Sequence, residues 1–254
     1  QKYKAERGLV MVQDPKTGKI LALGAYPNFD PNHYSEYKIE NFLNPVVQLI
    51  YEPGSVMKVI TIAAGLDAGK LTPETAFYDS GSLTLDGRTI KNWDNKAHGR
   101  VTMTEVIEQS INTGAAYAQK LIGKDLFYNY LVKFGFGRKT GISLPGELTG
   151  SVNNLKSTSR DINFATAAFG QGVSVTPLQL INAVSAIANK GILMSPQIVE
   201  GTPAEEIRRV ISGESAAKVT AMMVSAVTKA EVAHIPGYEI AGKTGTAQIP
   251  DLRR

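Results

Sequence analysis

Residues 55–66 of the chain read SVMKVITIAAGL, and at helical spacing they are apolar on nearly every face. A helix of this kind has no side to turn towards water, so it is buried on all sides. We therefore expect it to be the central helix of the molecule. With 254 residues, 43% of them hydrophobic, the chain is large enough to bury such a helix inside a single domain spanning 1–254.

The segments around this helix combine antiparallel strands with further helices. Two apolar runs at 8–14 and 19–24 flank the turn residues 15–18 and predict a β-hairpin, and residues 237–248 predict a late strand. Helical patterns lie between them, after a capping box at 102–105 and over 115–134, 161–172, 177–190 and 214–229. The order predicts an α+β fold, an antiparallel sheet covered by helices, in which the first hairpin pairs with the last strand.

Composition excludes several kinds of chemistry. The chain has no cysteine, and its three histidines, His33, His98 and His234, are scattered. Disulfides and thiol nucleophiles are therefore excluded, and a metal site or a histidine-based triad is disfavoured. The net charge of +4 comes with no basic block, so nothing indicates nucleic-acid binding. No apolar run approaches the ~20 residues that span a bilayer.

Ser55 and Lys58 form a candidate nucleophile and base. Without a thiol or a suitable histidine, a nucleophilic enzyme needs a hydroxyl activated by another base, and a lysine one helical turn away is one solution. Residues at i and i+3 share a helix face, so the amine can reach the hydroxyl. Burial would lower the pKa of this lysine and favour the neutral amine. The helix N-terminus offers a backbone N–H to a developing oxyanion.

The Ser-x-x-Lys pattern is weak by itself, because it also occurs at 35–38 and 215–218. The first copy lies in a polar stretch, and the second lies on an amphipathic helix beside Glu214. The alternative for any single copy is a helix-capping serine and a lysine that extends to solvent. Only Ser55 begins a buried helix, and this context favours it as the nucleophile.

Two further motifs follow along the chain. The first is Ser110-Ile111-Asn112, at an interruption between two helices. The second is Lys243-Thr244-Gly245-Thr246, on the predicted late strand. Each has a second copy, at 151–153 and 139–141, in a connecting loop rich in Gly and Pro. We favour the copies that stand in a helical frame and on a strand. Together with Ser55 and Lys58 they match the active-serine, penicillin-recognising set of motifs.

Over nearly its full length the chain resembles the transpeptidase domain of class B penicillin-binding proteins. The resemblance is carried by the three motifs and by DPKTG at 14–18, PNFDPN at 27–32, YEPGS at 51–55, FGQG at 169–172, TPLQ at 176–179 and AGKTGTAQ at 241–248. It implies the fold shared with serine β-lactamases, with a sheet-containing lobe at about 1–55 and 170–254 and a helix-rich lobe at about 56–169. The family continues with further strands, so the C-terminal strands are expected to be missing here.

The resemblance also implies a catalytic role for five residues. Ser55 would be the acylated nucleophile, and Lys58 would be its base. Ser110 would relay a proton to the leaving amine, and Asn112 would donate a hydrogen bond to the substrate amide. Lys243 would hold the proton network and the substrate carboxylate.

Further residues are implied in binding. The backbone N–H groups of Ser55 and Thr246 would form the oxyanion hole. The implied substrate-binding residues are Thr244, Gly245, Thr246, Gln248 and Trp93. For Trp93 the alternative is packing, and for Lys243 it is a solvated lysine on an edge strand.

Members of this family attack the penultimate D-Ala carbonyl of a peptidoglycan stem peptide, release the terminal D-Ala and pass the acyl group to an amine of a neighbouring strand. β-Lactams imitate the D-Ala-D-Ala end and stay bound as acyl-enzymes. The resemblance thus implies a D,D-transpeptidase without a metal or organic cofactor, whose partners are stem peptides, β-lactams and cell-wall synthesis proteins. It would lie at the extracytoplasmic, periplasmic face of the bacterial cytoplasmic membrane, anchored by an N-terminal segment outside this chain.

Two alternatives remain. A serine β-lactamase or a β-lactam sensor would share the fold and the acylation step, but a β-lactamase also needs a base for deacylation by water. The sequence ENFLN at 40–44 matches the Glu-x-x-Leu-Asn of class A β-lactamases, but it precedes Ser55, whereas that class places it after the nucleophile. A non-catalytic scaffold is disfavoured because all three motifs are intact.

Overall fold

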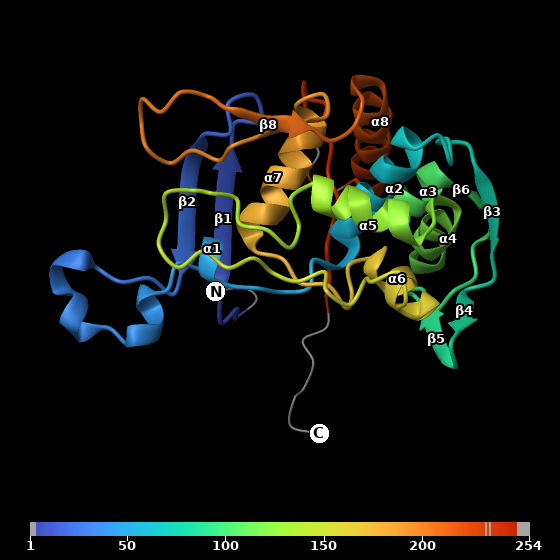
Figure 1. Cartoon of the computed structure of the whole chain (residues 1–254), viewed down its shortest axis with the longest axis horizontal. Helices are drawn as coiled ribbons and strands as arrows, with labels where there is room; N and C mark the ends of the chain where they lie inside the picture. Colours follow the sequence, from blue (N-terminus) through green and yellow to red (C-terminus); the bar gives the residue numbers. More distant parts are fainter. Residues whose placement is uncertain (1–3, 232, 234, 248–254) are drawn as a thin grey trace.

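The computed structural model describes residues 4–231, 233 and 235–247 (Figure 1). Its strands are β1 (Gly8–Gln13), β2 (Ile20–Tyr26), β3 (Ala76–Asp79), β4 (Ser82–Leu85), β5 (Arg88–Lys91), β6 (Gly99–Thr102), β7 (Ile192–Met194) and β8 (Glu206–Arg209). Its α-helices are α1 (Pro45–Gln48), α2 (Met57–Asp67), α3 (Met103–Glu108), α4 (Asn112–Ile122), α5 (Lys124–Lys133), α6 (Asp161–Ala167), α7 (Pro177–Ala188) and α8 (Gly213–Ala230). Short 3-10 turns occupy Pro31–Glu36, Ile39–Phe42 and Gly54–Val56.

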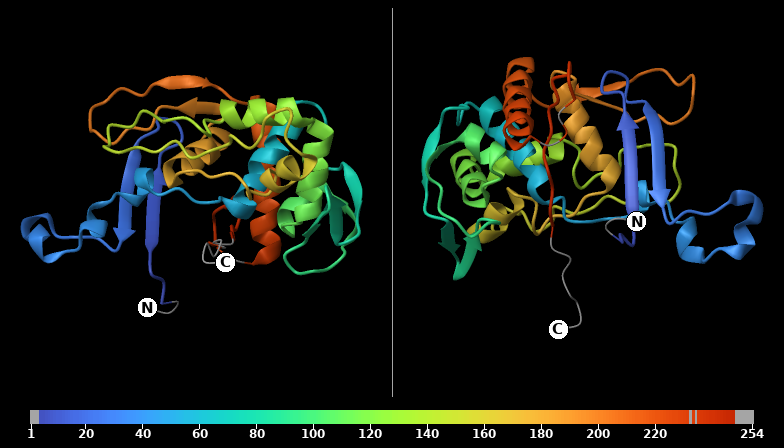
Figure 2. Two further views of the ribbon diagram at one scale, coloured as in Figure 1. Left: turned by 60° about the horizontal axis from the view of Figure 1, so that its bottom comes forward. Right: turned by 180° about the vertical axis from the view of Figure 1, so that it is seen from behind.

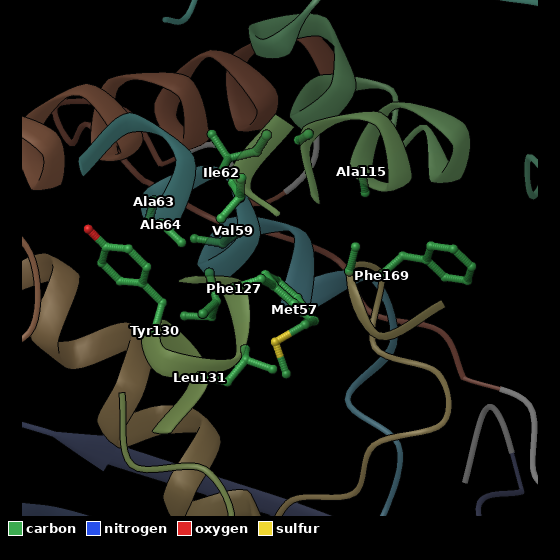
Figure 3. Close-up of a cluster of buried hydrophobic side chains, with 14 of the residues drawn as sticks. Met57, Val59, Ile62, Ala63, Ala64, Ala115, Phe127, Tyr130, Leu131 and Phe169 are labelled. Atoms are coloured by element: carbon green, nitrogen blue, oxygen red, sulfur yellow. The ribbon is translucent and has the colours of Figure 1, made fainter. Parts of the chain in front are cut away.

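The central helix is α2, and the chain enters it through the 3-10 turn at Gly54–Val56. Every residue from Met57 to Leu66 is buried, because α3, α4, α5 and α8 pack around the helix. In Figure 3, Val59 and Ile62 of α2 lie among buried side chains of neighbouring elements. The prediction of a helix buried on all sides is therefore confirmed.

Helices α3 and α7 begin at the predicted signals. Thr102 and Glu105 form the capping box that starts α3, and Thr176 with Gln179 forms a second box before α7. The predicted helix over 115–134 is two helices, α4 and α5. They are separated by Gly123, whose positive φ of 86° ends the first helix and starts the second.

The strands form four separate two-stranded antiparallel sheets within the described residues, β1–β2, β3–β6, β4–β5 and β7–β8. The mixture of helices and antiparallel strands is the predicted α+β class, but the continuous sheet is not present in this part of the chain. The prediction that the first hairpin pairs with a strand at 237–248 is wrong for 237–247, which contains no assigned strand.

This C-terminal segment packs against helices instead of pairing with a strand. The N–H of Gly242 donates to the carbonyl of Met223 in α8 at 3.4 Å, and Gly245 lies against Val56 at the start of α2. Its small residues permit this close approach, so the backbone lies next to helices and forms no β-sheet hydrogen bonds with a neighbouring strand. Residue 248 lies outside the described residues.

The elements are grouped on either side of α2 and α8 (Figures 1 and 2). Strands β3–β6 and helices α3, α4 and α6 lie on one side, and β1, β2, α1, α7, β7 and β8 lie on the other. One hydrophobic core runs through α2–α8. The exact lobe boundaries near 56 and 170 stay a prediction. None of the described helices combines the length and the apolar character that crossing a membrane requires.

Candidate active site

Four polar side chains from three distant parts of the chain form one hydrogen-bonded series. Lys58 Nζ lies 2.8 Å from Ser55 Oγ and 3.0 Å from Ser110 Oγ, and Lys243 Nζ lies 2.9 Å from the same Ser110 Oγ. Lys58 Nζ also donates to the carbonyl of Ser110 at 2.7 Å. A proton can therefore pass between the two hydroxyls and the two amines without a bridging water.

Two glycines let the backbone present Ser55 beside the C-terminal segment. Gly54 has a φ of +58°, and a Cβ placed on it would overlap with the carbonyl oxygen of Thr246. Gly170 has a φ of +82°, and a Cβ on it would overlap with the backbone of Gly54. Gly54 N donates to the Gly170 carbonyl at 3.2 Å. A side chain at either position would push the turn that carries Ser55 away from Thr246.

Ser110 lies between α3 and α4 and adopts a left-handed conformation with a φ of +58°. Residues other than glycine rarely adopt this region, and such conformations concentrate at functional sites. Here the conformation turns both the carbonyl and the hydroxyl of Ser110 towards Lys58. The interruption predicted between the two helices is thus the point at which the second motif contacts the first.

Burial changes the protonation of both lysines. Lys58 is fully buried, and this burial, together with the charge of Lys243, lowers the pKa of Lys58 to about 6. Burial also lowers the pKa of Lys243 to about 8. Near neutral pH the first amine is therefore mostly neutral and the second mostly charged. This is the difference expected of a base and a cation that holds an anion.

A cleft of about 1080 Å³ opens over this series. Ser55, Ser110, Thr244 and Thr246 line it, together with predicted residues Asn112 and Trp93. Trp93 is 70% exposed, which favours a place in the cleft wall over core packing. Gly245 lies beside Val56. Gln248 lies outside the described residues.

The alternative copies of the motifs have other contacts. Lys218 pairs with Glu214 at 2.6 Å on α8, and residues 35–38 are exposed. Thr140 N and Oγ1 both donate to Glu147 at 2.6 Å, so the loop copy of Lys-Thr-Gly is tied to its own loop. Ser151 pairs through its backbone with Ser174. The described contacts join none of these copies to Ser55 or Ser110.

Several residues of the cleft were not singled out from the sequence. They are Arg88, Thr89, Ile90, Lys91, Asn92, Asn95, Glu108, Gln109, Asn154, Ile162, Asn163, Thr166, Phe169, Gln171 and Gly172. The stretch FGQG at 169–172 carried a usable signal, because it is part of the family resemblance. The others follow no local pattern. Among the described residues, no group of three or more His, Asp or Glu side chains could hold a metal ion.

The fold and this site define the class of active-serine, penicillin-recognising proteins. The family model "Penicillin binding protein transpeptidase domain" matches residues 8–253. The chain therefore belongs to the penicillin-binding protein transpeptidase family.

Similar proteins agree with this assignment. Stage V sporulation protein D of Bacillus subtilis is 36% identical over 97% of this chain and 41% of its own length. The peptidoglycan D,D-transpeptidase FtsI homolog of Mesostigma viride is 30% identical over 98% of this chain and 47% of its own length. Penicillin-binding protein 3 of Mycobacterium tuberculosis, solved with aztreonam, has a TM-score of 0.86 and 33% identity over 96% of this chain and 58% of that one. The chain spans about two fifths of the first of these relatives.

Proposed function

We propose that this domain is a D,D-transpeptidase that cross-links peptidoglycan stem peptides through an acyl-enzyme on Ser55. The observation that carries the proposal is the unbroken series of contacts between Ser55, Lys58, Ser110 and Lys243. A scaffold that only bound partners would have no need for a buried lysine with a pKa of about 6 beside a serine hydroxyl.

The first half of the reaction is acylation. Neutral Lys58 takes the proton of Ser55 Oγ, which attacks the carbonyl carbon of the penultimate D-Ala. The backbone N–H groups of Ser55 and Thr246 stabilise the negative charge on the carbonyl oxygen. The C–N bond then breaks, and Ser110 passes a proton from Lys58 to the departing amine of the terminal D-Ala.

The second half repeats these steps in reverse order. The amine of a neighbouring stem peptide attacks the ester carbonyl, its proton returns through Ser110 and Lys58, and Ser55 leaves with a proton. During the first half, charged Lys243, with Thr244 and Thr246, holds the carboxylate of the terminal D-Ala. Asn112 contacts the substrate amide, and Trp93 forms a wall of the groove. The family resemblance supports Gln248 as a further substrate-binding residue.

The direct test is release of D-Ala from a synthetic peptide ending in D-Ala-D-Ala, with transfer of the acyl group to an added amino acid. Formation of the new peptide bond supports the proposal, and its absence under conditions in which penicillin is bound opposes it. The resemblance further supports two kinds of partner, β-lactams and the proteins of cell-wall synthesis. It also supports the extracytoplasmic face of the membrane as the location of the whole protein.

A β-lactamase activity is the main competing function, and we expect the penicillin acyl-enzyme to be long-lived instead. Glu40, the carboxylate of the misplaced β-lactamase-like motif, is exposed on a 3-10 turn and does not line the cleft. Intact-mass measurements over time should therefore show an adduct whose lifetime is many times longer than one catalytic cycle of a β-lactamase. Rapid steady-state hydrolysis of penicillin would identify a β-lactamase.

Acylation is also expected to follow a bell-shaped pH profile. The fraction of neutral base grows as the pH rises through the Lys58 pKa of about 6, and the cation is lost above the Lys243 pKa of about 8. The rate constant of acylation by a fluorescent penicillin should therefore rise and then fall across this window. A profile that increases steadily through both values would contradict a role for the Lys243 charge.

A further inference from the structure

A short segment at the end of β5, residues 91–93, forms hydrogen bonds with the turn that carries Ser110. The Lys91 carbonyl accepts a hydrogen bond from Asn112 Nδ2 at 2.8 Å. Trp93 Nε1 donates to the carbonyl of Gln109 at 3.1 Å. The first and last residues of the segment thus contact the chain on either side of Ser110.

The middle residue, Asn92, caps helix α4. Asn92 Oδ1 accepts from the backbone N–H of Asn112 at 3.1 Å and from that of Thr113 at 3.2 Å. The helix has no side-chain cap of its own, because its N-cap residue is Ile111. Unpaired N–H groups at a helix start are costly when buried, so the side chain of Asn92 replaces a local cap.

The orientation of the Asn92 amide is fixed by its other contacts. Its Nδ2 donates to Asp79 Oδ2 at 2.7 Å and to the Lys96 carbonyl at 3.0 Å, and both partners only accept. The amide oxygen must therefore face α4. Asn92 is only 2% exposed, so water cannot replace these partners readily.

Asp79 is fully buried and receives four hydrogen bonds. Besides Asn92, the donors are Thr113 Oγ1 at 2.6 Å, Gly81 N at 2.9 Å and His98 N at 3.0 Å. Burial by itself would raise the pKa of Asp79, but these hydrogen bonds hold it below the ordinary value. Asp79 is therefore an ionised acceptor that links β3 to the second residue of α4.

We propose that Asp79 and Asn92 are positioning residues for catalysis, which hold Ser110 and Asn112 in register with Ser55 and Lys58. Neither residue lies in a catalytic motif. The inference rests on the proposed function, because it assigns to Asp79 and Asn92 the alignment of the proton relay. It also gives Trp93 a second role, since its indole N–H fixes the residue before Ser110.

The test begins with the near-isosteric variant Asn92→Asp. Its new carboxylate would face Asp79 at the distance of a hydrogen bond, and two ionised carboxylates repel each other there. We expect the first-order acylation step with a fluorescent penicillin to slow about tenfold or more above neutral pH, as misplacement of a catalytic group does. The dissociation constant of the non-covalent complex should change much less.

Two features separate positioning from a general loss of stability. The ratio of variant to wild-type acylation should recover at low pH, where one proton is shared by the two carboxylates. The ring of His98, which contacts Asp94 and Gln109, also lies nearby, but both proteins contain it and the ratio removes its effect. The exchanged pair Asp79→Asn with Asn92→Asp restores one donor and one acceptor between the two side chains. It loses the acceptor for the backbone N–H of His98, so it should regain only part of the rate.

A second variant covers the case in which Asn92→Asp does not fold. Thr113→Val removes the hydroxyl that donates to Asp79 and keeps the shape of the side chain. We expect a several-fold slower acylation and faster amide hydrogen exchange at Asn112 and Thr113. The matched control is Asn153→Asp, an exposed position in the alternative Ser-x-Asn copy, which should leave both measurements unchanged.

The outcomes are distinct. Wild-type rates in Thr113→Val and in a folded Asn92→Asp would overturn the inference, as would a slow Asn92→Asp variant that neither low pH nor the exchanged pair improves. If the wild-type protein itself formed no adduct, the proposed function would fail. Hydrogen exchange at Asn112 and Thr113 would then still report whether Asp79 and Asn92 hold the turn.

Discussion

Replacement of Ser55 by alanine is expected to abolish the covalent reaction of this domain with a β-lactam. The hydroxyl of Ser55 is the one that lies 2.8 Å from the buried amine of Lys58, and no other atom of the alanine variant can attack from that position. Loss of a nucleophile typically lowers the rate by about a million-fold. The Ser55→Ala variant should therefore show no added mass after prolonged incubation with penicillin, while its melting temperature stays close to that of the wild type.

Matched variants at the other Ser-x-x-Lys copies make this result specific. Ser35 is exposed on a 3-10 turn, and Lys218, the partner of Ser215, is paired with Glu214. Ser35→Ala and Ser215→Ala should thus form the adduct at the wild-type rate. Peptide mapping of the wild-type adduct should locate it on the peptide that contains Ser55. An adduct on any other serine would show that the wrong nucleophile was chosen.

The sequence was informative where one short segment decides its own environment. An apolar pattern on every face is sufficient to place α2 in the core, and a lysine within it is then buried with its pKa lowered. Capping boxes are equally local, so α3 and α7 begin where Thr102 and Thr176 predict. Context of this kind also separated the favoured copy of each motif from the copy that makes other contacts.

Contacts between distant residues could not be predicted in the same way. Asp79 and Asn92 have no unusual neighbours in the sequence, and they become important only because β3, β5 and α4 meet. The strand predicted at 237–248 is not present in the described part, 237–247, for a related reason. Small and β-branched residues permit an extended backbone, but whether that backbone pairs with a strand or packs on α8 depends on which surfaces are nearby.

Removal of the Lys243 side chain is expected to have the second largest effect, and the comparison with Lys139 tests which Lys-Thr-Gly copy serves the site. Lys243 Nζ contacts Ser110 Oγ at 2.9 Å, and after burial its charge is the second cause that lowers the pKa of Lys58. Lys243→Ala removes a partner of the proton relay and the cation for the substrate carboxylate. We expect acylation to fall by at least about 100-fold.

The same variant should also alter the pH dependence of the reaction that remains. Without the Lys243 charge the pKa of Lys58 rises, so the rising limb of the profile moves to higher pH. The falling limb disappears because the variant has no Lys243 amine to lose its proton. Lys139 is exposed, and its neighbour Thr140 is bound to Glu147, so Lys139→Ala should keep both the rate and the bell-shaped profile. Equal losses from the two variants, measured by stopped-flow acylation across the pH range, would show that the 139–141 copy also serves the active site.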